Sequence, residues 1–103
     1  MNRFKIKIVT EALADIQEIT TWYNEQQASL GKRFQTTALK QINSLAKNPH
    51  IYSVRYNKIR CMIIKRFPYM VHFYIDENNS TVEVLAVIST GRHPRIWLEK
   101  TGE

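Results

Sequence analysis

The sequence predicts an α+β domain in the order β-α-α-β-β-β(β), with a twisted antiparallel sheet and an N-terminal helical hairpin packed on one of its faces. The first observation is that residues 59–88 are rich in β-branched and aromatic side chains and are interrupted by short polar breaks, which is typical of strands. The second is that such short breaks most simply join antiparallel neighbours in a meander. The third is that two segments within residues 11–47 repeat apolar side chains at the helical period. We therefore expect the 103 residues to form one domain.

The N-terminal elements follow from their side-chain patterns. Residues 3–8 predict a half-buried strand, because basic and apolar side chains alternate strictly along RFKIKI. Thr10 is expected to cap a helix over residues 11–27. A second helix over residues 32–47 is expected to end at Asn48-Pro49, since the residue before a proline is pushed out of the helical region. Trp22 lies on the acidic side of the first helix, where it either contacts a partner or packs over the helix margin.

The C-terminal half is expected to carry the sheet. Residues 50–56 predict a short strand or an extended lead-in, and residues 59–75 predict a hairpin that bends at Phe67-Pro68. Both faces of this hairpin are apolar, and the helices can cover only one of them. Either residues 96–98 of the tail or a separate chain must cover the other face, and we favour a separate chain. The side chains expected to contact it are Trp22, Met62, Ile64, Met70, His72 and Tyr74.

Charge is unevenly distributed along the chain. The net charge is +6, every charged residue between Val9 and Gly31 is acidic, and every one between Lys32 and Ile75 is basic. A basic region of this kind attracts RNA, DNA or an acidic protein segment, and the alternative is a solvated basic surface. No apolar run approaches the roughly 20 residues of a membrane span. The single cysteine suits a reducing compartment, so we expect a cytoplasmic protein without membrane contact.

A basic cluster is the strongest candidate for a functional site. Cys61 is isolated and is expected to pack, and the histidines have no partners at metal-ligand spacing, so neither a metal ion nor a cofactor is expected. Arginine suits phosphate, and aromatic rings stack on bases. The residues expected to bind a target or nucleic acid are Lys58, Arg60, Lys65, Arg66, Arg92, Arg95 and Trp97. Arg60, Arg92 and His93 are the candidate catalytic residues, and the alternative is a solvated rim with a capping tryptophan.

Several short motifs resemble a known family. They are Asp15-Ile16 and Trp22-Tyr23, Leu30-Gly31-x-x-Phe34, Asn48-Pro49-x-x-Tyr52, Arg55-Tyr56-x-x-Ile59-Arg60, Arg66-Phe67-Pro68-Tyr69 and Arg92-x-Pro94-x-x-Trp97. Their order and spacing over nearly the whole chain resemble the RelE/ParE superfamily of bacterial toxins, which are often labelled plasmid-stabilisation proteins. The resemblance implies a RelE/ParE-like fold, inhibition of growth, and a cognate antitoxin that holds the toxin inactive in a hetero-oligomer.

The resemblance implies two possible targets. RelE-like members cut mRNA on the ribosome, and ParE-like members poison DNA gyrase. Nuclease members commonly carry an arginine where this chain has Met70 and a histidine near Ser89-Thr90-Gly91, whereas Arg92 matches and Trp97 stands roughly where a tyrosine is usual. The incomplete nuclease set favours ParE-like action on gyrase. The alternatives are a RelE-like endoribonuclease that uses Arg60, Arg92 and His93, and an inactive homologue.

Overall fold

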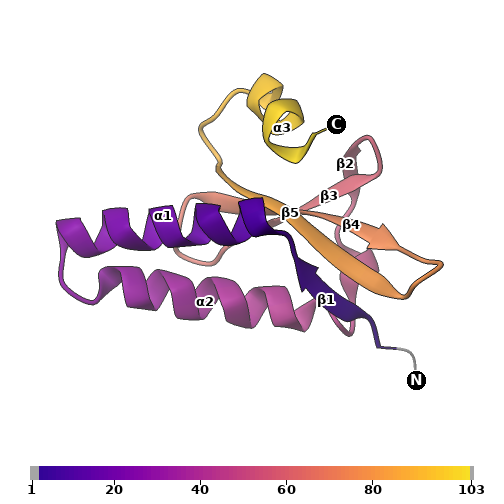
Figure 1. Cartoon of the computed structure of the whole chain (residues 1–103), viewed down its shortest axis with the longest axis horizontal. Coiled ribbons are helices and arrows are strands. Elements are labelled where there is room, and N and C mark those ends of the chain that lie inside the picture. Colours follow the sequence, from indigo (N-terminus) through magenta and orange to yellow (C-terminus); the bar gives the residue numbers. More distant parts are fainter. Residues whose placement is uncertain (1–2, 103) are drawn as a thin grey trace.

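A five-stranded sheet with helices on both sides forms the framework of the protein (Figure 1). The computed structural model describes residues 3–102. The elements are β1 (Lys5–Ile8), α1 (Thr10–Gln26), α2 (Leu30–Ser44), the 3-10 turn η1 (Pro49–Ile51), β2 (Val54–Tyr56), β3 (Ile59–Ile63), β4 (Tyr69–Asp76), β5 (Thr81–Ser89) and α3 (Pro94–Thr101). The predicted α+β class and the helical hairpin are confirmed.

The sheet is mixed, and in this respect the prediction of an antiparallel sheet was wrong. Its strand order is β1-β5-β4-β3-β2, and β2 to β5 pair antiparallel as the meander predicted. β1 instead pairs parallel with β5, from Lys5 beside Thr81 to Ile8 beside Val84. The reason is the connection between β1 and the meander, which consists of two helices. The chain enters the meander at the margin far from β1, so β1 lies beside the last strand, β5.

The helical hairpin is held by a close approach at its turn. The Gly31 amide donates a hydrogen bond of 2.8 Å to Asn24 Oδ1, and a Cβ at Gly31 would lie only 2.1 Å from the Thr20 carbonyl oxygen. Ser29 adopts the left-handed region with φ 72° and sets the start of α2 two residues before the predicted one. Thr10 was wrongly assigned as the cap, because the N-cap position of α1 is Val9 and no side chain caps it.

The main core lies between the hairpin and one face of the sheet. Phe34 and Ile42 of α2 are fully buried against Phe73 of β4 and its neighbours. Met62 and Ile64 belong to this same core, with 1% and 0% of their surface exposed. They therefore cannot contact a partner while the hairpin is in place, and their assignment to a partner surface is corrected.

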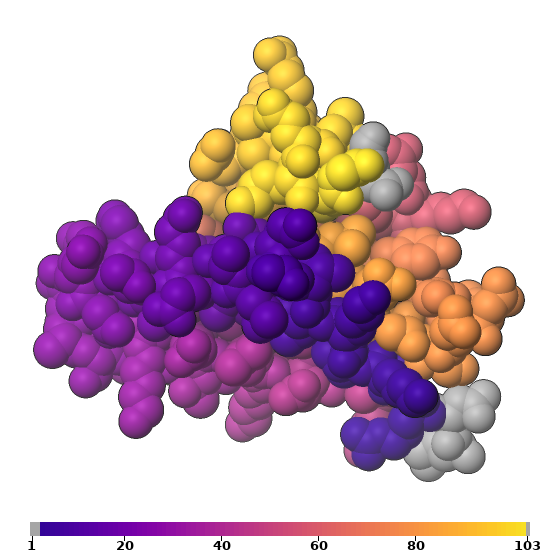
Figure 2. Space-filling view, in the orientation of Figure 1, coloured from indigo at the N-terminus to yellow at the C-terminus, as the bar shows by residue number. Residues whose placement is uncertain are grey.

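α3 covers much of the second face of the sheet, where we had favoured a separate chain. The Trp97 ring lies 5.1 Å from the His72 ring and 5.3 Å from the Tyr56 ring. On the other side of α3, Lys100 forms an ion pair with Asp15 of α1. α3 stands on the body of the protein as a protrusion rather than as a flat cover (Figure 2). The tail, which was the alternative to a separate chain, therefore packs on this face, and it does so as a helix that the sequence pattern did not predict.

Candidate functional site

A packed polar cluster lies under α3 on the second face of the sheet. His72 of β4 has no exposed surface, and its Nδ1 shares a hydrogen bond of 2.8 Å with the Tyr56 hydroxyl. The Cys61 thiol lies 3.5 Å from the same nitrogen. The Trp97 ring covers this group, and the Arg55 guanidinium lies 5.7 Å from the centre of that ring. One cation and four neutral groups therefore occupy this face of the sheet.

Burial keeps the titratable members of this cluster uncharged. Burial, aided by the positive charge of Arg55, lowers the pKa of His72 to about 4. Burial also raises the pKa of the Cys61 thiol to about 11, although Arg55 opposes this change. At neutral pH the imidazole is neutral and enclosed, and the thiol is protonated. This cluster consequently has no reactive thiolate and no exposed base.

The three candidate catalytic residues are not brought together. Arg60, at the start of β3, pairs with Phe73 near the end of β4. Arg92 follows Ser89, which pairs with Tyr69 at the start of β4. The two arginines thus lie toward opposite ends of β4. The expectation that they belong to one basic cluster was wrong, because in a three-stranded antiparallel meander the first strand starts at the end opposite to where the third finishes.

Arg60 and His93 have structural roles that their hydrogen bonds define. Arg60 Nη1 donates to the Tyr52 carbonyl oxygen at 2.6 Å, which ties η1 and the segment after it to the sheet. His93 occupies the N-cap of α3, where its Nδ1 accepts a hydrogen bond of 3.0 Å from the Arg95 amide.

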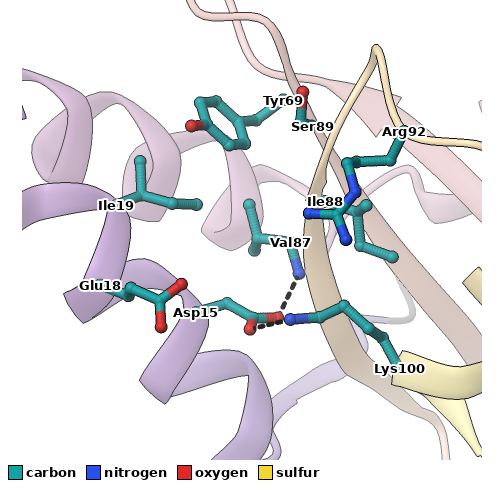
Figure 3. A pocket seen from close by; sticks show the side chains of 9 residues that line it. All are labelled: Asp15, Glu18, Ile19, Tyr69, Val87, Ile88, Ser89, Arg92 and Lys100. Atoms are coloured by element: carbon teal, nitrogen blue, oxygen red, sulfur yellow. Dashed lines mark hydrogen bonds and ion pairs between the residues drawn. The ribbon is translucent and has the colours of Figure 1, made fainter. Parts of the chain in front are cut away.

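Arg92 lines an open pocket between α1, β5 and α3 (Figure 3). β1 ends at Ile8, so the Val87 amide has no strand partner on that side and donates instead to Asp15 Oδ2 at 2.9 Å. The second oxygen of Asp15 binds Lys100. Glu18 and Tyr69 complete the polar lining, and burial together with the Glu18 charge raises the pKa of Tyr69. This arrangement fixes α3 to α1.

Sequence reasoning did not find the acidic side of this pocket. From the sequence, we assigned Asp15 and Glu18 only to the solvated acidic face of the first helix. Lys100 lies in a tail for which no helix was predicted. The sequence carried no signal for this acidic side, because part of the β5 edge needs a partner only once the shorter β1 is known to pair with β5.

The other predicted residues are dispersed over the surface. Lys58 lies in the β2–β3 turn beside a hollow that Asp76 and Glu77 also line. Lys65 and Arg66 lie exposed in the β3–β4 turn, and Arg95 lies exposed on α3. Among the predicted partner contacts, Trp22 is 51% exposed, Tyr74 is half-buried, and Met70 is buried.

Metal binding and membrane insertion find no support in the part of the chain that is described. Within residues 3–102, no three His, Cys, Asp or Glu side chains are grouped so that they could hold a metal ion. Over the same range, no helix is both long enough and apolar enough to cross a membrane.

Solved structures of toxin–antitoxin proteins share this fold. A chain of the chromosomal ParDE system from P. aeruginosa superposes with a TM-score of 0.75 at 14% identity, over 84% of this chain and 96% of that one. The E. coli RelE toxin in the free state gives 0.71 at 12% identity, over 99% and 96%. A chain of the RelBE2 toxin–antitoxin complex of Mycobacterium tuberculosis gives 0.64 at 18% identity, over 86% and 93%. A comparison with curated protein sequences gave no significant match.

The shared fold and a matching family model together define the class of protein: it is a toxin of the RelE/ParE superfamily, the toxic half of a type II toxin–antitoxin system. A family model described as the ParE toxin of the parDE type II toxin–antitoxin system matches residues 6–94. The chain belongs to this ParE toxin family.

Proposed function

We propose that this toxin stops growth by a ParE-like action on DNA gyrase and not by cutting RNA. The observation that carries the proposal is the separation of the candidate catalytic groups. RNA cleavage requires a base, an acid and a cation at one phosphate. Here Arg60 is engaged with a backbone carbonyl, Arg92 lies toward the opposite end of β4, and His93 caps a helix. The match to the ParE family model supports the same conclusion.

The face under α3 supports the proposal independently. A nuclease needs its cations and proton-transfer groups open to the substrate. The groups clustered under α3 are a buried neutral imidazole, a protonated thiol, the tilted Tyr56 and Trp97 rings, and a single cation, Arg55, beside the Trp97 ring. Water and substrate are excluded from His72 while α3 is docked, because the imidazole has no exposed surface.

We also propose that a cognate antitoxin neutralises the toxin in a hetero-oligomer. The RelBE structures that share the fold are toxin–antitoxin complexes. Met62 and Ile64 are excluded from the contact surface by burial. Large apolar side chains on the surface are available, among them Trp22 at 51% exposure and Ile63 at 63%. Co-expression with the adjacent short open reading frame should yield a stable complex and restore growth.

The experiment that tests the target compares two activities of the purified toxin. A supercoiling assay with purified gyrase should show inhibition or trapped cleaved DNA, and primer extension on cellular mRNA after induction should show intact messages. Cleavage at defined codons that disappears in Arg92→Ala, with gyrase unaffected, would instead establish RelE-like activity. Harmless expression without an antitoxin would indicate an inactive homologue.

A further inference from the structure

We infer that a groove between α2 and the β3–β4 turn binds the phosphodiester backbone of a nucleic acid. The groove is lined on the helix side by Thr36, Thr37, Lys40 and Ser44, and on the turn side by Lys65 and Arg66. We call it the α2–turn groove. The inference does not rest on the gyrase proposal, since it concerns direct contact between this chain and a nucleic acid.

The charge of the α2–turn groove is exclusively positive. No carboxylate lines it, and the sequence has no acidic residue between Lys32 and Ile75. Within residues 3–102 the ion pairs are His50 with Glu77 and Lys100 with Asp15, so Lys40, Lys65 and Arg66 are without a carboxylate partner there. All three side chains are exposed. Unpaired cations in a hollow concentrate positive potential and attract a polyanion.

Gln41 fixes the turn against the helix, so the groove exists before any ligand binds. Its Nε2 donates to the Ile63 carbonyl oxygen at 3.0 Å, and its Oε1 accepts from the Lys65 amide at 2.7 Å. Arg66 is held in the left-handed region with φ 70°, a conformation that a residue with a side chain adopts reluctantly. A groove that is already formed binds without the entropic cost of ordering the turn.

The helix side of the α2–turn groove carries groups that suit a phosphate backbone. Thr36, Lys40 and Ser44 are four residues apart along α2 and share one stripe of the helix, with an axial rise of about 6 Å between neighbours. This stripe offers the Thr36 hydroxyl and the Lys40 ammonium as donors, while Lys65 and Arg66 face it from the turn. The Ser44 hydroxyl lines the same stripe but donates to the Gln41 carbonyl oxygen within α2. Hydroxyl, lysine and arginine side chains are the groups that contact phosphate oxygens in nucleic-acid complexes. An extended backbone that lies along α2 would meet donors on both sides.

The test measures binding of labelled oligonucleotides to the full chain by fluorescence anisotropy at several salt concentrations. Duplex DNA, single-stranded DNA and RNA of equal length identify the source of the phosphates. The groove variant is Lys40→Gln/Lys65→Gln/Arg66→Gln. The matched control is Arg3→Gln/Lys5→Gln/Lys7→Gln, which removes the same charge from β1 and the segment before it, at side chains that do not line the groove. Circular dichroism establishes that both variants fold.

The groove variant should bind nucleic acid at least about tenfold more weakly. The slope of log K against log salt concentration should also become shallower by about 2 to 3, because each phosphate contact contributes about 0.9 to that slope. The control should lose less than about threefold by long-range charge alone. Equal losses in the two variants would overturn the inference, as would failure of all three nucleic acids to bind. Binding of a polyglutamate peptide through the same three residues, as tight as that of the nucleic acids, would assign the groove to an acidic protein segment instead.

Discussion

Mild acid should destabilise this toxin through His72. The imidazole is fully buried and neutral in the folded protein, and its pKa falls from the ordinary 6.5 to about 4 because of burial and the Arg55 charge. The imidazole therefore binds a proton near pH 6.5 in the unfolded chain, but only near pH 4 in the folded protein. The contribution of the neutral His72 to folding stability is fully present above pH 6.5 and is lost as the pH falls from 6.5 to about 4.

The size of the effect follows from the two pKa values. Lowering the pH from about 7 to about 5 should reduce the free energy of unfolding by about 2 kcal/mol through this residue alone. That amount is large beside the 5–15 kcal/mol that is typical for a whole domain, as an order of magnitude. Protonation would also place a second positive charge near Arg55 and weaken the packing of Trp97, so α3 should loosen first.

The assay is urea unfolding followed by circular dichroism at several pH values, with His72→Gln as the control. Glutamine retains a hydrogen-bond acceptor for Tyr56 and does not titrate, so its stability should change much less between about pH 7 and pH 5. Nuclear magnetic resonance of the imidazole in the unaltered protein gives the pKa directly. A His72 that titrates near 6.5 in the folded state, or a glutamine variant with the same pH dependence, would refute the reasoning.

Three further substitutions test other contacts. Gly31→Ala places a methyl group 2.1 Å from a carbonyl oxygen of α1, and thermal unfolding should show a loss of about 1–3 kcal/mol because the helices must separate. Asp15→Ala removes the ion-pair partner of Lys100 and leaves the Val87 amide without a hydrogen-bond acceptor, so protease should cleave α3 faster. An unchanged cleavage rate would show that α3 docks without this contact. Arg60→Gln should lower stability by about 1 kcal/mol while growth inhibition persists at equal protein levels; lost inhibition at normal stability would return Arg60 to the functional site.

Much of the fold could be predicted because local patterns determine it. The helical hairpin and the meander follow from side-chain periodicity and from breaks at Asn48-Pro49 and Phe67-Pro68, whose effects are confined to neighbouring residues. The parallel pairing of β1 with β5 could not be predicted, since strictly alternating side chains show that a strand has one buried face and do not show which strand lies beside it.

The site was harder to predict than the fold because it depends on distances through space. Residue types selected Arg60, Arg92 and His93 as candidate catalytic residues, but the register of the meander separates the two arginines. α3 was missed because its eight residues carry a single large half-buried ring, Trp97, and so show little helical periodicity. Lys65 and Arg66 were identified from charge alone, whereas their neighbours on α2 join them only through the tertiary fold.

The pairing of β1 with β5 has a consequence for when the toxin can form. Lys5 is synthesised well before its partner Thr81. Until Thr81 is made, the growing chain can assemble the helical hairpin from local contacts, while the sheet margin and the α1–β5 contacts are still missing. A nascent chain therefore completes its native structure only after β5 has been synthesised, and a product that is terminated before β5 should be harmless to the cell that makes it.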